Sequence, residues 1–219
     1  MDHTPEAVSR LIADLQDEDE FVRTQAAFAL GVLGEPAVQP LVQLLDAPSS
    51  DLRMRAAWAL GVIGAAAVPK LLELAESDTH QLRVEAIRVL GVVGEARALN
   101  QLLIALTDPN EQVASRAARA LGKISDPRAY HPLITALHHP SPDVRYEACR
   151  ALGDLHIADA ANLLNELAES DSSSTSWGAT VADAARWAAA EARSEVQTTR
   201  DSEFARVSKL LQEHRRHLK

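Results

Sequence analysis

Histidine and cysteine are the side chains of this sequence that could bind a metal or act as a nucleophile. The 219 residues include 8 histidines and 1 cysteine. His131, His138 and His139 flank one predicted helix and His156 follows another, so a metal cluster is one interpretation. Histidines at helix ends and in loops are more often solvated, and we therefore predict no metal site. Cys149 takes a position that alanine or isoleucine holds in four similar segments, which favours a buried apolar role over a nucleophile.

The sequence shows no other pattern that is typical of a catalytic or cofactor site. Glycine-rich loops that hold phosphates precede a helix, whereas Gly31-Val32-Leu33-Gly34 is predicted to end one. No spacing of serine, histidine and aspartate stands out, and a single cysteine excludes a disulfide within the chain. We therefore predict that the protein is not an enzyme and that it carries no cofactor.

The elements that must position the remaining polar and aromatic side chains come from an internal repeat. A triplet of Ala or Val, Leu and Gly recurs at steps of 30, 30, 31 and 31 residues and ends at Gly31, Gly61, Gly91, Gly122 and Gly153. Twelve residues before each glycine stands a side chain that commonly caps a helix N-terminus: Asp19, Ser49, Thr79, Asn110 and Ser141. The pattern predicts a second helix from each cap to each glycine and a first helix between them, and no stretch alternates like a strand.

The sequence therefore predicts an all-α fold, an α-solenoid of about five to six helix pairs. Junctions are expected near residues 34, 64, 94, 125 and 156, within a repeat array over residues 1–170. Residues 171–194 are interpreted as a degenerate sixth repeat, because Trp187 falls where Phe28 and Trp58 fall. Residues 195–219 have apolar side chains near helical spacing and are predicted to form a C-terminal capping helix.

One stretch carries a family resemblance, namely Val22-Arg23…Ala26-Ala27…Ala29-Leu30-Gly31 and its four later copies. This pattern resembles the HEAT-repeat superfamily, specifically the short repeats of phycobilisome-lyase-like proteins, and covers residues 5–170. The resemblance implies helix pairs stacked into a right-handed superhelix whose second helices line the concave side. One HEAT-like class, the deoxyhypusine hydroxylases, binds two irons through His-Glu pairs on second helices, but the matching positions here hold no histidine. The resemblance therefore indicates an architecture rather than an activity.

Helical geometry places one series of side chains on the concave side of the second helices. The early members are mostly aromatic or apolar and the later ones mostly basic. These candidate partner-binding residues are Thr24, Phe28, Met54, Trp58, Val84, Arg88, Arg119, Lys123, Tyr146 and Arg150. Exposed aromatics together with arginines are typical of protein interfaces. The alternative is that Phe28 and Trp58 fill gaps between helices and that the arginines pair with nearby acids.

A second series of arginines lies eight residues before four of the glycines: Arg23, Arg53, Arg83 and Arg145. Geometry places it at the border with the neighbouring helix pair, close to acids that end first helices, such as Asp46, Glu76 and Asp108. Ion pairs there would fix the angle between successive pairs. We therefore expect a structural role between repeats for this series.

Charge narrows the functions that the concave surface could serve. Lys and Arg number 22 and Asp and Glu 31, and the resulting formal charge of −9 disfavours nucleic acid and anionic membranes as partners. We therefore predict a non-catalytic scaffold or adaptor that binds another protein on its concave surface. The lyase-like resemblance implies an alternative, an accessory subunit for bilin attachment or removal on phycobiliproteins, and nucleic-acid binding in the groove is a third interpretation.

The chain start and the apolar runs bear on localisation. Met-Asp-His-Thr-Pro-Glu lacks the basic and then apolar layout of a signal peptide. The longest uncharged apolar run, residues 56–69, is shorter than the roughly 20 residues that a membrane helix needs. A cytoplasmic protein is the expectation.

Overall fold

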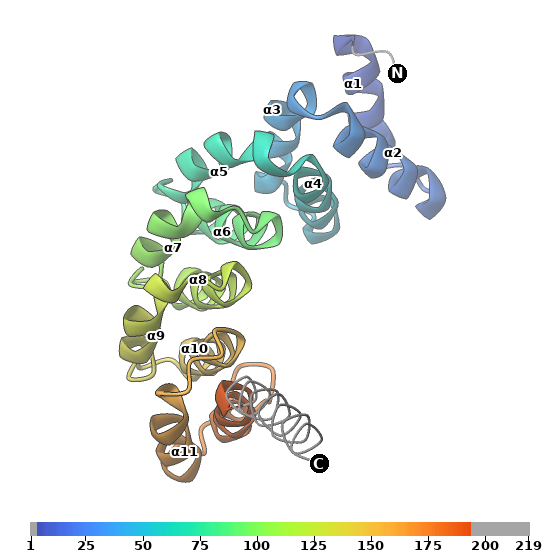
Figure 1. Ribbon diagram of the computed structural model, residues 1–219. Coiled ribbons are helices and arrows are strands. Elements are labelled where there is room, and N and C mark those ends of the chain that lie inside the picture. The colour runs from blue at the N-terminus through green and yellow to red at the C-terminus, as the bar shows by residue number, and fades with distance from the viewer. Residues whose placement is uncertain (1–3, 194–219) are drawn as a thin grey trace, which may run out of the picture.

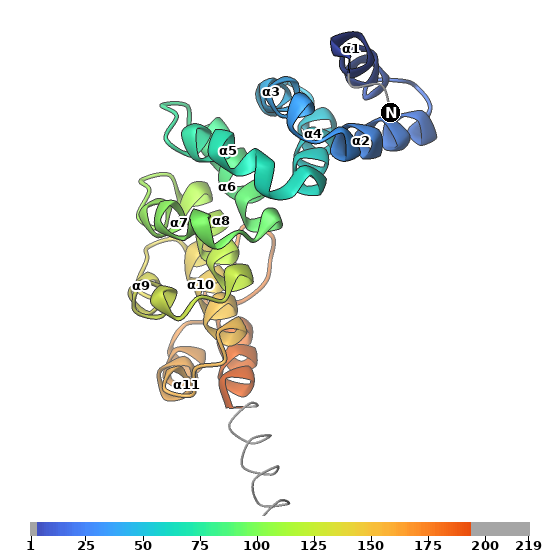
Figure 2. The same ribbon diagram turned by 45° about the horizontal axis from the view of Figure 1, so that its top comes forward.

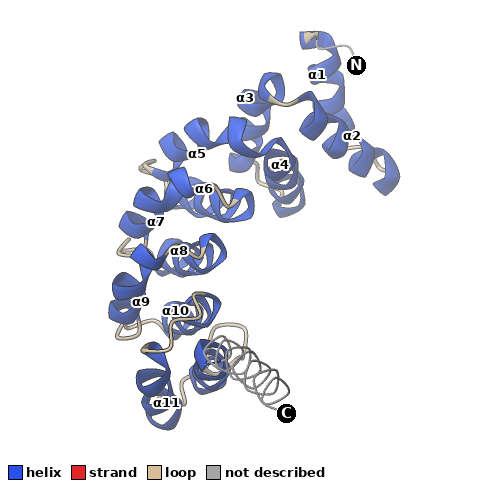
Figure 3. Cartoon of the chain, in the orientation of Figure 1, coloured by secondary structure: helices blue, strands red, loops and turns tan. Residues whose placement is uncertain are grey.

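The computed structural model describes residues 4–193 as a curved array of helices in two layers (Figure 1). The outer layer contains α1 (Pro5–Asp14), α3 (Glu35–Gln43), α5 (Val68–Ala75), α7 (Leu99–Ala105), α9 (Tyr130–Ala136) and α11 (Ala160–Ser170). The inner layer contains α2 (Glu20–Leu33), α4 (Ser50–Ile63), α6 (His80–Val93), α8 (Glu111–Ile124), α10 (Pro142–Asp154) and a last helix over residues 181–193. Figure 3 shows helices and their connecting loops throughout the described part, in which the one β-bridge joins Ser174 to Thr180. The fold is therefore an all-α solenoid.

The inner helices begin where the sequence places their caps. Asp19 accepts a hydrogen bond from the Phe21 amide at 2.8 Å, and Ser49 accepts one from the Leu52 amide at 3.3 Å. Asn110 accepts from two amides of the first turn of α8. Such bonds satisfy amides that have no partner inside a helix. Thr79 and Ser141 stand at the predicted cap positions of α6 and α10 but make no such bond, so side-chain capping operates at α2, α4 and α8.

Small residues let neighbouring inner helices approach closely. The leucine of each triplet is fully buried, and alanines surround it. A Cβ atom on Gly91 would lie 2.7 Å from the Cβ of Ala120, and one on Gly122 would lie 2.8 Å from the Cα of Ala151. Both distances are shorter than van der Waals contact. The glycine of the triplet therefore sets the spacing between inner helices.

The chain takes a positive φ where it passes from an inner helix to the next outer one. These positions are Gly34, Gly64, Gly94, Ser125 and His156. Glycine adopts this backbone conformation without steric cost, whereas serine and histidine do so at some cost. We propose that these residues mark the ends of successive units, the division that the sequence suggests. The predicted C-terminal capping helix over residues 195–219 lies outside the described residues.

One helical segment among the described residues, Ser50–Ala75, is long and apolar enough to cross a membrane by length and composition alone. It comprises α4, the short turn Gly64–Ala67 and α5, and its backbone changes direction at Gly64, where φ is 68°. Leu60, Val68 and Leu71 of this segment are buried, whereas Met54 and Trp58 are exposed. The buried leucines and valine of the segment serve helix packing.

Candidate functional site

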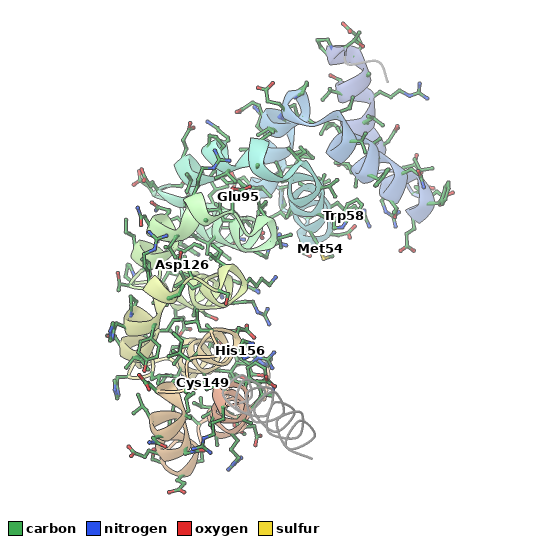
Figure 4. All side chains as sticks on the ribbon, viewed as in Figure 1. Met54, Trp58, Glu95, Asp126, Cys149 and His156 are labelled. Carbon is green, nitrogen blue, oxygen red and sulfur yellow. The ribbon has the colours of Figure 1, made fainter. Side chains whose placement is uncertain are left out.

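The N-terminal half of the inner surface carries a group of exposed apolar side chains, here called the apolar patch. Its members are between 41% and 57% exposed: Phe28, Val32, Met54, Trp58, Val62 and Val92. Figure 4 shows Met54 and Trp58 together on the inner side of α4, facing the open side of the arc. A cavity of about 220 Å³ between α2 and α4 is lined by Thr24, Ala27, Met54, Arg55 and Trp58. Phe28 and Trp58 therefore present their rings to solvent.

The predicted basic residues of the C-terminal half largely have partners within the chain. Arg88 donates to the buried Glu85, with Nε at 2.8 Å from Oε2. The Nε of Arg119 lies 3.3 Å from Oε2 of Glu147 on the next inner helix. Arg150 stacks over the ring of Trp187, 4.1 Å from its centroid. These side chains are oriented by their neighbours rather than extended freely into solvent.

Three further predicted binding residues differ in their exposure. Val84 is only 8% exposed, so it belongs to the core although its edge lines a cavity. Tyr146 is half-buried, because its ring packs edge-on against Trp177 with centroids 5.5 Å apart. Thr24 is exposed and donates its hydroxyl to the Glu20 carbonyl at 2.9 Å. The predicted series is therefore not a uniform row of exposed side chains.

Trp177 is a residue of the inner surface that the repeat pattern did not identify. It is 52% exposed and lies in the loop after α11, which Figure 2 shows passing α10 on the way to the last helix. The amide and hydroxyl of Ser176 anchor this loop, since each donates to a carboxylate oxygen of Asp143 at 2.7 Å. No periodicity predicts such a placement, because the loop falls between repeat segments.

This loop closes one side of a cavity of about 440 Å³ on the inner surface. Side chains from α6, α8 and α10 form the other walls, and the lining includes Val84, Gln112, Ser115, Arg116, Arg119, Asp143, Glu147, Ser176 and Trp177. Burial lowers the pKa of Arg116, and the like charges of Arg119 and Arg88 lower it further. Burial raises the pKa of Glu147 despite the arginines around it. The cavity is thus a polar site with crowded, partly desolvated charges.

The second arginine series has a regular set of contacts. Each guanidinium donates through Nη1 to two backbone carbonyls in the loop before its own helix, at 2.7–3.1 Å. Arg83 and Arg145 also bind an aspartate of the following loop, Asp108 and Asp171 respectively. Arg53 instead contacts Glu85, and the buried Nε of Arg23 has no hydrogen-bond partner. Among the described residues, the anticipated acids Asp46 and Glu76 do not pair with this series.

The residues considered for metal or nucleophilic chemistry lie apart from this surface. Cys149 is fully buried, and burial raises the pKa of its thiol to about 12. Within residues 4–193, no group of three or more histidine, cysteine, aspartate and glutamate side chains is arranged to hold a metal ion. His156 turns its Nδ1 toward the Glu191 carbonyl at 3.3 Å. These side chains therefore contribute to packing and helix ends in the structure.

Solved structures with the same architecture include natural and designed proteins. The complex of CpcE and CpcF of phycocyanin lyase from Nostoc sp. PCC7120 has 25% sequence identity and a TM-score of 0.61, covering 70% of this chain and 97% of that chain. An engineered protein has 22% identity and a TM-score of 0.52, covering 85% and 96%. A designed armadillo repeat protein in complex with the peptide (KR)4 has 21% identity and a TM-score of 0.51, covering 84% and 99%. The two designed proteins show likeness of fold alone.

Sequence comparison gives the family. No curated protein sequence matches this chain at a significant level. The family model for HEAT repeats matches residues 2–61, 38–107, 68–137 and 99–192, which together cover most of the sequence. The Leu-Gly triplets, the caps and the two-layered array of helix pairs are the physical counterpart of that match. The chain belongs to the HEAT-repeat family.

Proposed function

We propose that this protein is a non-catalytic scaffold or adaptor that binds another protein on the concave surface formed by its inner helices. The observation that carries the proposal is the exposure of Phe28, Met54 and Trp58, of which Met54 and Trp58 line a 220 Å³ cavity. Soluble proteins seldom expose several large apolar side chains together unless a partner covers them. Aromatic anchors set in such a hollow commonly dominate the binding energy of an interface.

The basic side chains of the same surface suit binding to acidic groups at the edge of the interface. Arg119, Lys123 and Arg150 are exposed beyond the apolar patch along the inner helices. Charged groups at the edge of an interface accelerate association and select among partners. We infer that the partner combines an apolar contact for the apolar patch with acidic groups for the arginines. A cytoplasmic location stays a prediction.

Paired variants test the proposal. Phe28→Ala combined with Trp58→Ala is expected to abolish capture of the partner from an extract of the source cells, identified by mass spectrometry and then re-bound in purified form. Ile104→Ala is the matched control, because Ile104 is an exposed apolar residue of the outer helix α7. Helical circular dichroism should be unchanged in both, since the removed rings are half exposed. Capture that survives the double substitution would contradict the proposal.

A second candidate function is suggested by the likeness to the phycocyanin lyase complex. An accessory subunit of this kind would handle a linear tetrapyrrole, whose apolar body suits the apolar patch and whose propionates suit arginine. Titrating the protein into a free linear tetrapyrrole and recording its absorbance tests this candidate. A shifted spectrum that Trp58→Ala removes supports it, and an unchanged spectrum excludes it.

A further inference from the structure

The 440 Å³ cavity contains a guanidinium group without a partner. Arg116 lies on α8 and is half-buried, yet within residues 4–193 no hydrogen bond or ion pair reaches it. Its five N–H donors match the two oxygens of a carboxylate in a planar, bidentate arrangement. A half-buried guanidinium that lines a cavity and makes no hydrogen bond or ion pair is a candidate binding group for an anion.

Glu147 and Glu85 attract Arg116 electrostatically, but the hydrogen bonds and ion pairs of the nearby acids go to other residues. Glu85 accepts hydrogen bonds from Arg53, Gln81 and Arg88. Glu147 pairs with Arg119, and Asp143 is held by Ser176.

The crowding of positive charge around Arg116 follows from these pairings. Burial and the charges of Arg119 and Arg88 lower the pKa of Arg116 and outweigh the attraction of Glu147 and Glu85, so an added carboxylate would favour its charged form. Trp177 also lines this cavity, and its ring packs edge-on against Tyr146. The cavity therefore offers both a cation and an aromatic ring.

A second cavity of about 290 Å³ adjoins the first along the groove between α8 and α10. Arg119 and Glu147 line both cavities, and Lys123 and Arg150 add basic groups to the second. In the described part of the chain, the Lys123 ammonium has no hydrogen-bond or ion-pair partner. Lys123 follows Arg116 by seven residues of α8, which corresponds to about 10 Å along the helix. Two unpaired cations thus mark the two ends of one groove.

We propose that this groove binds an acidic segment of a partner protein through two carboxylates about 10 Å apart, close to the ~9 Å between side chains three residues apart on one face of a polyproline II segment. The first carboxylate binds Arg116, with the adjoining apolar part of the segment against Trp177, and the second binds Lys123 and Arg150. This assignment rests on the proposed function, because it gives the partner on the concave surface a chemical identity.

Carboxylates fit the groove better than phosphates do. Asp143, Glu147 and Asp154 line the two cavities and repel a doubly charged group more strongly than a singly charged one. A nucleic-acid backbone is further disfavoured by the formal charge of −9. The groove and the apolar patch both lie on the inner helices, so one partner can contact both.

A peptide titration with the full chain tests the assignment. The probe is the acetylated and amidated peptide Ser-Glu-Leu-Ala-Glu-Ser, and its counterpart has glutamine in place of both glutamates. Nuclear magnetic resonance of the ¹⁵N-labelled protein follows the indole N–H signals of Trp58, Trp177 and Trp187. The acidic peptide is expected to shift the Trp177 signal to saturation, and the glutamine peptide is expected not to. Raising the salt concentration should weaken the shift.

Variants of Arg116 and Lys123 test whether these two cations bind the acidic peptide that shifts the Trp177 signal. Arg116→Gln and Lys123→Gln should each weaken binding of the acidic peptide about tenfold, the loss of one charge-assisted contact. Arg128→Gln is the matched control, because Arg128 is an exposed arginine that pairs with Asp126 outside the groove. Lys123 is exposed, so its substitution keeps the test valid if Arg116→Gln fails to fold.

Three results would overturn the assignment. The first is an equal shift of the Trp177 signal with the glutamine peptide. The second is an unchanged affinity for the acidic peptide in both Arg116→Gln and Lys123→Gln. The third is a shift by pimelate, a free dicarboxylate, as strong as the shift by the acidic peptide. If Trp177 does not respond while capture of the partner still depends on Phe28 and Trp58, the acidic segment is wrong and the scaffold function stands. If the acidic peptide binds but capture of the partner protein does not depend on Phe28 and Trp58, the apolar anchors proposed for the scaffold function are wrong.

Discussion

Arg83 and Asp108 form a bidentate ion pair between consecutive helix pairs. Nε of Arg83 lies 2.8 Å from Oδ2 and Nη2 lies 3.0 Å from Oδ1 of Asp108, which stands in the loop before α8. The remaining nitrogen, Nη1, donates to the carbonyls of Ser77 and Asp78 in the loop before α6. One guanidinium thus joins two successive loops. Arg145 repeats the arrangement with Asp171.

Asp108→Asn is expected to lower the free energy of unfolding by about 2 kcal/mol, because it leaves a largely buried guanidinium without its counter-charge. Thermal or urea unfolding followed by circular dichroism measures the change. Asp183→Asn serves as control, since both side chains of the Asp183–Arg186 pair are exposed and the pair should contribute little. Equal stability of the two variants would show that the pair between loops is not structural.

The same aspartate predicts a dependence on pH. Burial alone would raise the pKa of Asp108, but the hydrogen bonds from Arg83 and from the Asn110 amide outweigh it and hold the pKa below its ordinary value of 3.8. Its contribution to stability is therefore present above pH 3.8 and is lost as the pH falls through the lowered pKa. Acid titration of unfolding should show a steeper loss for the native chain than for Asp108→Asn in this range.

Arg23 lacks the acid that Arg83 and Arg145 have. Ala47 stands two residues before the cap Ser49, as Asp108 stands before the cap Asn110, and the buried Nε of Arg23 is left without a partner. Ala47→Asp is therefore expected to stabilise the chain by about 1 kcal/mol. The gain should disappear when Arg23→Gln is added, and a gain that persists would have another origin.

Two glycines of the repeated triplet should respond differently to substitution. A Cβ on Gly122 would lie 2.8 Å from the backbone of Ala151, whereas one on Gly61 would meet only a methyl group of Val92, at 2.9 Å. Alanine favours the helix by up to about 1 kcal/mol over glycine, so Gly61→Ala should be nearly neutral once Val92 rotates. Gly122→Ala should destabilise by about 1–2 kcal/mol, because two helix backbones must separate. Unfolding midpoints of the two variants give the comparison.

Cys149 should be chemically inert in the folded protein. Its side chain is fully buried and the pKa of its thiol is raised to about 12. Reaction with a disulfide reagent at pH 8 is expected to be at least about a hundredfold slower than in urea, because it requires opening of the array. Rapid labelling without denaturant would show that α10 opens readily.

The periodic sequence predicted the elements and their order because each repeat encodes its own local structure. Caps such as Asp19 and Asn110 start inner helices, the buried leucines form the core, and the HEAT-repeat assignment from the triplets is confirmed. The exposure of Phe28 and Trp58 also follows from helical spacing, since the face opposite the buried leucine must point away from the core. Their role in binding stays a prediction.

Tertiary structure alone decided which polar side chains are free and which are paired. The partner of Arg88 is on its own helix, that of Arg119 is on the next one, and Arg150 finds Trp187 farther along the chain. Trp177 reaches the inner surface through a loop that is longer than the corresponding loops of the other units, and Arg116 makes no hydrogen bond or ion pair within the described residues. Periodicity specifies the face of a helix on which a residue lies. The distance to a charge 28 or more residues away depends on how closely the helices pack, and only the folded chain sets it.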